Sequence, residues 1–277
     1  MGTTTMSAPM VLSQGSFLRT DSESFLQAAA AADFAAVDLW MAAIGSWKAS
    51  RIEAEADALG IRIDSLCRGG DAVFSASAFD DSRRAIDTAA QLGARVLVVT
   101  AGPDRDATAD APARTTEALA RLVPHAAQAD VILALEPFHP MFIGERSFVV
   151  TLRAANDIIA PLDPAWVQLA IDAYHLWWDV ELDSQLDRAS GRIAAVHVSD
   201  WLVPTTELLR GRGVPGEGII PLARFLASVA RVGYQGPIEI EVLNDRFAAM
   251  SPFVAALELK NALAGLLAPS NALPLSA

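Results

Sequence analysis

The sequence has little of what a disulfide-bonded, nucleic-acid-binding or membrane protein needs. Cys67 is the one cysteine among 277 residues, so no internal disulfide can form, and there are four histidines. The formal net charge is −12, and no cluster of Lys and Arg offers a surface for nucleic acid or an anionic membrane. No apolar run reaches the roughly 18 residues of a membrane span, and the N-terminus lacks the features of a secretory signal. These absences predict a soluble, cytoplasmic protein that binds neither nucleic acid nor membranes.

Apolar residues, in contrast, are plentiful. Hydrophobic residues make up 52% of the chain and charged residues 19%, which is enough for one large core. We therefore expect one domain over residues 1–277, with an ordered core from about 9 to 268 and a short tail at each end. This length fits a TIM barrel, for which about 250 residues is usual.

Short β-type runs alternate with longer amphipathic helical stretches along the chain. The predicted strands are Pro9–Ser13, Ala36–Trp40, Ile61–Leu66, Arg95–Thr100, Val131–Glu136, Val167–Asp172, Ile193–His197 and Gly236–Leu243. The predicted helices are Ser22–Ala32, Ser46–Leu59, Asp80–Leu92, Ala111–Ala129, Ser147–Ala160, Leu176–Ala189, Leu222–Val232 and Pro252–Leu267. Eight such repeats imply parallel strands that can close into a barrel. The rival, an open doubly wound sheet, usually has a glycine fingerprint after its first strand, and the turn here is Q-G-S-F. We therefore predict a single (β/α)8 TIM barrel.

Four predicted strands in the second half of the chain end in residues that can bind a metal: Glu136, Asp172, His197 and Glu241. Any one of them could merely cap a helix, but four at successive strand ends indicate a shared site, since TIM-barrel active sites lie there. Three carboxylates and one imidazole suit Mn²⁺, Mg²⁺ or Co²⁺ better than a structural zinc site. The sequence therefore predicts one divalent metal, with Mn²⁺ preferred and Mg²⁺, Co²⁺ or Zn²⁺ as alternatives.

Other residues near these strand ends are candidates for substrate binding or proton transfer. His175 follows Asp172 by three positions and could hydrogen-bond a hydroxyl group at the rim or be a core histidine. His139 could orient a ligand or act as a base. Arg212, in a long glycine-rich loop, could bind a substrate oxygen or phosphate or simply be solvated. Trp40 and Arg68 are further candidates for substrate binding, although core packing is the commoner reason for a Trp.

These motifs resemble those of the xylose-isomerase-like TIM barrel superfamily of sugar phosphate isomerases and epimerases. The resemblance is carried by L-E-P at 135–137, I-D-A-Y-H at 171–175, V-H-V-S-D at 196–200, R-G-V-P-G-E-G at 212–218 and G-Y-Q-G-P-I-E-I-E at 233–241. The spacing is most similar to the keto-sugar 3-epimerase branch. That resemblance implies a metal bound by the four strand-end residues, and substrate contacts from His175 and Arg212. Phe142 departs from the pattern, because those epimerases have a second substrate-contacting Glu six residues after the first metal ligand.

The leading hypothesis is a divalent-metal-dependent sugar isomerase or epimerase that acts on a keto sugar or derivative through a metal-bound enediolate. Glu136 and Glu241 would remove and return the proton beside the carbonyl group. An alternative is a metal-dependent lyase on 3-keto-glycosides, similar to the catalytic subunit of C-glycoside deglycosidases, with His139 as the base.

An endonuclease IV-like DNA repair enzyme is less favoured, because its three-zinc site needs more histidines than this chain has. The expected partner is a small sugar. A homo-oligomer is common in the family, and a lyase would be expected to need a second subunit.

Overall fold

Eight parallel strands close into a barrel in the computed structural model, which describes residues 8–44, 49–71, 76–104 and 108–268. The strands of the barrel are β1 (Met10–Ser13), β2 (Ala36–Trp40), β3 (Arg62–Asp71), β4 (Val96–Thr100), β5 (Ile132–Leu135), β6 (Val167–Asp172), β7 (Ile193–Val198) and β10 (Ile238–Ile240). Their order is β1-β10-β7-β6-β5-β4-β3-β2, and β1 also pairs with β2, which closes the ring. The predicted (β/α)8 TIM barrel is confirmed.

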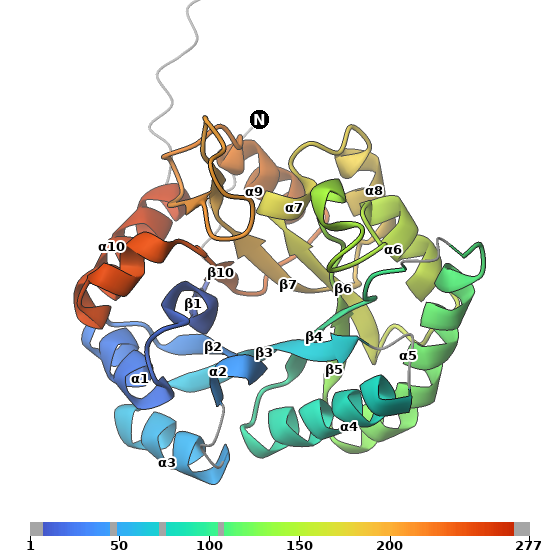
Figure 1. Ribbon diagram of the computed structural model, residues 1–277, viewed down its shortest axis with the longest axis horizontal. Coiled ribbons are helices and arrows are strands. Elements are labelled where there is room, and N and C mark those ends of the chain that lie inside the picture. The colour runs from blue at the N-terminus through green and yellow to red at the C-terminus, as the bar shows by residue number, and fades with distance from the viewer. Residues whose placement is uncertain (1–7, 45–48, 72–75, 105–107, 269–277) are drawn as a thin grey trace, which may run out of the picture.

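Helices surround the strands as an outer ring (Figure 1). They are α1 (Ser22–Ala31), α2 (Met41–Ile44), α3 (Ala49–Leu59), α4 (Ala76–Gln91), α5 (Ala111–Gln128), α6 (Leu152–Ile159), α7 (Ala173–Leu176), α8 (Leu182–Arg188), α9 (Leu222–Arg231) and α10 (Pro252–Leu267). Three 3-10 turns, η1 (Gln14–Phe17), η2 (Pro140–Phe142) and η3 (Asp245–Ala249), lie in the connections. A small antiparallel hairpin of β8 (Asp200–Trp201) and β9 (Arg212–Gly213) lies outside the barrel sheet. None of the described helices is long and apolar enough to span a membrane.

The strands are buried on both faces, as is usual for parallel strands that are covered by helices. The outward side chains join the large core between the strands and the helices. A second, smaller core cluster contains Cys67, Val96, Val98, Ala134, Ala170 and Ala195. The side chains of this cluster face the barrel interior. Because successive side chains of a strand alternate between its two faces, the residues two positions after Ala134, Ala170 and Ala195 also face the interior.

This alternation defines two layers of inward-facing positions on β5, β6, β7 and β10. We call the upper set, at the carboxyl ends of the strands, the rim layer: Glu136, Asp172, His197 and Glu241. We call the set two positions earlier the lower layer: Ala134, Ala170, Ala195 and Glu239. Seven of these eight residues are at most 4% exposed and the eighth, Ala195, is 6% exposed, so both layers are buried inside the barrel.

Local sequence features account for several of the helix ends. The side chain of Asp21 accepts a hydrogen bond from the backbone N–H of Ser24 and caps α1. Gly60, Gly93 and Gly233 follow α3, α4 and α9 with φ values of 68°, 70° and 88°, a conformation that glycine adopts without strain.

Two predicted helices were wrong in part. The stretch Leu176–Ala189 is not one helix, because α7 ends at Leu176 and α8 starts at Leu182. In between, the Asp179 carboxylate accepts a hydrogen bond from the backbone N–H of Glu181, a local bond that favours a turn. The helix predicted from Ser147 starts at Leu152, since Thr151 caps its first turn through the backbone N–H of Ala154.

Candidate metal centre and cavity

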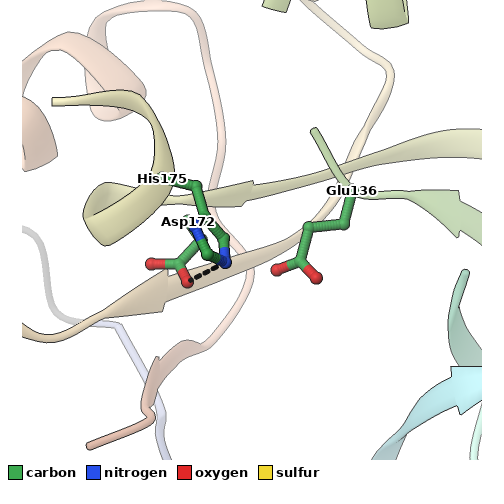
Figure 2. Close-up of side chains that lie close together, drawn as sticks. All are labelled: Glu136, Asp172 and His175. Atoms are coloured by element: carbon green, nitrogen blue, oxygen red, sulfur yellow. Dashed lines mark ion pairs between the residues drawn. The ribbon is translucent and has the colours of Figure 1, made fainter. Parts of the chain in front are cut away.

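The rim layer brings the four predicted metal ligands together from four strands. One ligand atom each of Asp172, His197 and Glu241 lie within 4.8 Å of one another, and so do those of Glu136, Asp172 and His175. Figure 2 shows the Glu136 side chain pointing toward Asp172, with the His175 ring beside the Asp172 carboxylate. Buried groups of Glu, Asp and His at this spacing are consistent with a divalent metal site. Which of these atoms bind a metal stays a prediction.

Arg212 pairs with two acids of the rim layer. Its Nη1 atom is 3.1 Å from Oδ2 of Asp172 and 2.8 Å from Oε2 of Glu241, and its side chain is 3% exposed. The guanidinium group also lies over the ring of Tyr174, 4.5 Å from the ring centroid. Burial alone would lower the pKa of Arg212, but Asp172 and Glu241 outweigh this effect and raise it. Arg212 is therefore a permanent cation next to the predicted ligands.

The glycine-rich loop that carries Arg212 is anchored by a buried carboxylate. Asp200 Oδ2 accepts hydrogen bonds from the backbone N–H groups of Gly216 and Gly218, each at 2.9 Å. A Cβ atom at Gly218 would lie 2.3 Å from the carbonyl oxygen of Trp201, so only glycine fits there. The hairpin of β8 and β9 pairs Trp201 with Arg212. Together with the contacts of Asp200 and Gly218, this pairing explains how the glycine-rich loop brings Arg212 to the barrel.

His175 lies inside α7 and is 1% exposed. Its ring stacks on Phe138 with centroids 4.3 Å apart, and Phe142 meets it edge-on at 5.8 Å. Its Nδ1 atom accepts a hydrogen bond from the backbone N–H of His139 at 3.2 Å. Burial lowers the pKa of His175 well below its usual value, so the ring is neutral. Its Nε2 atom lies 3.6 Å from Oδ2 of Asp172 and 3.4 Å from Nη2 of Arg212, so it faces both an acceptor and a donor.

The charges of the rim layer do not balance without bound protons or a further cation. Glu136, Asp172 and Glu241 carry three negative charges when ionised, and Arg212 supplies one positive charge. Burial raises the pKa of Glu241 to about 8 despite the opposing effect of Arg212, and burial also raises the pKa of Asp172. Buried charges of one sign are unfavourable unless they are paired or bound to a metal. With all three carboxylates ionised a charge of −2 remains, which bound protons or a divalent cation would compensate.

His197 supports the same conclusion from its ring nitrogens. Both are buried without a hydrogen bond to any described residue, although Nδ1 is 3.3 Å from Oε1 of Glu136. Burial lowers the pKa of His197, but the carboxylates of Glu239 and Glu136 outweigh it and raise the pKa well above its ordinary value. A buried imidazole nitrogen that faces carboxylates needs either a proton or a metal ion between them. The residues therefore fit a divalent metal.

A cavity of about 240 Å³ lies against the rim layer. Its lining includes the carboxylates Glu136 and Glu241, His175, the aromatic side chains Trp40 and Phe138, and the cations Arg146, Arg210 and Arg212. The indole Nε1 of Trp40 is buried and has no hydrogen-bond partner among the described residues. A Cβ atom at Gly15 would lie 2.7 Å from the Trp40 ring, which explains the single glycine of the Q-G-S-F turn. The cavity thus offers hydrogen-bonding, charged and apolar walls to a polar molecule.

Another predicted residue, His139, lies among aromatic rings and not in the lining of the cavity. The ring of His139 lies between Trp178 and Trp201, at centroid distances of 5.6 and 4.9 Å, and its Nδ1 atom accepts a hydrogen bond from the backbone N–H of Met141. His139 does not line the cavity, and burial lowers its pKa. The side chain of Arg68 lies outside the described part of the chain.

A second pair of buried carboxylates was missed by the sequence analysis. Asp38 accepts hydrogen bonds from the hydroxyl groups of Ser13 and Ser65 at 2.9 and 3.0 Å, and Ser65 is also 3.3 Å from Oε2 of Glu239. Burial raises the pKa of Asp38 and of Glu239. The alternation in I-E-I-E could have shown that Glu239 shares the inward face of Glu241, whereas nothing local to Asp38 indicates its partners.

The chain belongs to the family of xylose isomerase-like TIM barrels, whose model matches residues 26–264. Among curated proteins it is similar to the L-ribulose-5-phosphate 3-epimerase UlaE of Salmonella paratyphi A. The two are 30% identical over 200 residues, which are 67% of this chain and 66% of UlaE. The resemblance to the xylose-isomerase-like superfamily is confirmed, and so is a distant similarity to the keto-sugar epimerases.

Solved structures share the whole barrel. Protein SMc04130 from Sinorhizobium meliloti 1021 is 32% identical, with a TM-score of 0.81 over 94% of this chain and 96% of that one. The IOLI protein, solved with a bound zinc atom, has a TM-score of 0.83 over 94% of this chain and 98% of that one. Its identity of 15% shows the shared fold alone.

Proposed function

We propose that this protein is a divalent-metal-dependent epimerase or isomerase of a keto sugar or its phosphate ester. The observation that carries the proposal is the rim layer itself: three buried carboxyl groups and an imidazole, next to a cavity of about 240 Å³. The name of the similar protein UlaE, an L-ribulose-5-phosphate 3-epimerase, supports this reaction class. The zinc atom in the structure of IOLI supports metal binding in barrels of this fold.

Glu136, Asp172, His197 and Glu241 would hold the metal in this proposal. Mn²⁺ is the ion we propose, because a set rich in carboxylate oxygens with one imidazole suits it. When bound, the metal supplies Lewis-acid polarisation of a carbonyl group and its neighbouring hydroxyl, which acidifies the adjacent C–H bond.

Glu136 and Glu241 are the proposed acid–base pair, because both line the cavity. One carboxylate accepts the proton from the carbon beside the carbonyl group, which leaves an enediolate. The other carboxylate, protonated beforehand, delivers its proton to the opposite face of the same carbon and inverts its configuration.

Arg212 and His175 are the proposed hydrogen-bond donors to substrate oxygens. Both line the cavity: the Arg212 guanidinium group carries several N–H donors, and a neutral His175 ring carries one. Donors fixed in a buried site stabilise the negative charge that develops on the oxygens of an enediolate.

Two further arginines in the lining of the cavity favour a substrate with an anionic group. Arg146 and Arg210 line the cavity together with Arg212, so the positive charge there is not confined to the residue that pairs with the rim layer. Arg210 is held by Asp245 at 2.8 Å. A phosphate ester is the class of anion that Arg binds well, and we propose it as the preferred form of the substrate.

A product assay on a panel of substrates tests the proposed function. Metal-free protein would be supplied with Mn²⁺ and incubated with ketopentoses, ketohexoses, their phosphate esters and 3-keto-glucosides. NMR would then identify the products. We expect one epimer or aldose–ketose pair, formed with Mn²⁺ and absent with a chelator. Release of the aglycone from a 3-keto-glucoside, with no epimer formed, would replace this proposal by the lyase.

A further inference from the structure

Glu239 interrupts an otherwise apolar pattern in the lower layer. On β5, β6 and β7 the lower-layer position is alanine, whereas on β10 it is a carboxylate that is 4% exposed. Burying a carboxylate is costly unless it has partners, and the proposed acid–base steps make no use of this one. Its position therefore needs a different explanation.

The partner that faces Glu239 is His197. The two residues are Cα partners in the pairing of β10 with β7, and Oε2 of Glu239 is 3.5 Å from Nε2 of His197. Within the described residues, Oε1 of Glu239 and both ring nitrogens of His197 are buried without a hydrogen bond. Buried polar groups in folded proteins are normally paired, and here an N–H donor and a carboxylate acceptor face each other.

The other ring nitrogen of His197 faces the rim layer. Nδ1 is 3.3 Å from Oε1 of Glu136. A neutral imidazole carries one proton. If that proton is on Nε2, it meets Glu239, and the lone pair of Nδ1 is left to face the space among the rim-layer carboxylates. If it is on Nδ1, the lone pair of Nε2 faces the Glu239 carboxylate, which is repulsive.

We propose that Glu239 is a positioning residue that accepts the Nε2 proton of His197 and thereby keeps Nδ1 free to bind the metal. The inference rests on the proposed function, because it concerns the metal assigned to the rim layer. A carboxylate that accepts a hydrogen bond from a metal-binding histidine fixes both its tautomer and its ring orientation. The Ser65 hydroxyl, 3.3 Å from Oε2, holds Glu239 from the other side.

Calorimetric titration of Mn²⁺ into the metal-free protein tests this role. Glu239→Ala should bind Mn²⁺ at least about tenfold more weakly, because loss of such a partner typically costs 10- to 100-fold in affinity. Glu239→Gln should stay within about threefold of the wild type, since its amide oxygen can accept the same hydrogen bond. Asp38→Asn is the matched control: it removes a buried charge that shares Ser65 with Glu239, and among the described residues no hydrogen bond or ion pair joins Asp38 to His197, so only their charges interact.

The protonated nitrogen of His197 can be identified directly by ¹⁵N NMR of the zinc-loaded, histidine-labelled protein. Four histidines make the assignment simple, and we expect the His197 proton on Nε2. A proton on Nδ1, an Mn²⁺ affinity of Glu239→Ala equal to that of the wild type, or an equal loss in Asp38→Asn would each overturn the inference. If Glu239→Ala does not fold, the tautomer in the wild type decides. A wild type that binds neither metal overturns the proposed function as well.

Discussion

The rim layer and the lower layer lie on the same four strands, two residues apart, yet they differ in charge and surroundings. The rim layer has four ligand-type side chains, a buried arginine pairs with two of its acids, and a cavity lies against it. The lower layer has three alanines that pack in the small interior cluster, and one glutamate. Neither layer is exposed, so burial alone does not distinguish them.

This difference indicates a division of roles within the barrel interior. The lower layer fills space between the strands with small apolar side chains, which favours close packing. The rim layer instead gathers acidic groups whose charge must be compensated by bound protons or by an additional cation. Glu239 is the exception that links the layers, because it lies at a packing position and faces a rim-layer ligand. The first pair of variants below compares two residues that are alike in burial but belong to different layers.

Glu241→Gln should have the largest effect on turnover. The substitution keeps the shape of the side chain but removes the proton-transfer group, which typically costs about 10² to 10⁴-fold in rate. Glu239 is equally buried and belongs to the same strand. Its substitution, Glu239→Gln, should lower the rate at least about tenfold less than Glu241→Gln does, because the role of Glu239 is to position His197. Steady-state assays with Mn²⁺ would measure both, and Glu53→Gln on the exposed face of α3 is the neutral control. Equal losses in Glu241→Gln and Glu239→Gln would erase the distinction between the layers.

Arg212→Ala should mainly lower the free energy of unfolding of the metal-free protein. It leaves Asp172 and Glu241 buried and unpaired, a change that typically costs about 3–5 kcal/mol. Mn²⁺ should restore part of this stability, because it binds the folded state. The matched control is Arg224→Ala, whose side chain is 76% exposed in its pair with Asp183 and should contribute at most about 1 kcal/mol. Denaturant unfolding with and without Mn²⁺ measures both variants, and similar small losses would contradict the assigned role of Arg212.

The affinity for Mn²⁺ should rise with pH. In the metal-free protein the raised pKa of Glu241, about 8, means that this carboxyl group is protonated below that pH. A metal needs the carboxylate, so binding at pH 7 must release the proton, and affinity should increase up to about tenfold per pH unit below pH 8. Titrations at pH 6, 7 and 8 in two buffers of different ionisation enthalpy would count the protons released. Affinity that does not change over this range would contradict a proton held by the rim layer.

Arg210→Ala should have the smallest effect and one that depends on the substrate. If Arg210 binds an anionic group of the substrate, its loss should raise KM for the phosphate ester about tenfold, as for a lost charge-assisted hydrogen bond. The KM of the unphosphorylated sugar should not change, which makes that substrate the internal control. Equal changes for the two substrates would remove the argument for a phosphate ester.

The fold could be predicted because its determinants are local. Each strand is a short apolar run, and the helices that lack special turns start and end at recognisable residues, such as Asp21 and Gly60. The positions of Glu136 and Asp172 could also be predicted, because a polar residue at the end of a buried parallel strand lies at the rim of the barrel.

The contacts that organise the site could not be predicted, because they join residues far apart in the chain. Ser65 and Glu239 are 174 positions apart, and Arg212 reaches Asp172 across 40 positions. The break between α7 and α8, after Leu176, was missed because the helical sequence pattern continues through it. The turn there is favoured by the hydrogen bond that the Asp179 carboxylate accepts from the backbone N–H of Glu181. The burial of His175 follows from the same short helix.

Proton exchange in D₂O tests the central claim most directly, because it follows the proposed acid–base step without requiring the physiological substrate to be identified first. Protein supplied with Mn²⁺ would be incubated with L-ribulose 5-phosphate and with ketohexoses, and NMR would report deuterium at each carbon. We predict that deuterium enters only at the carbon whose configuration changes, beside the carbonyl group, and that Glu241→Gln abolishes the exchange. Turnover without deuterium at that carbon, or no exchange on any keto sugar by protein that demonstrably binds Mn²⁺, would contradict proton transfer by the rim layer.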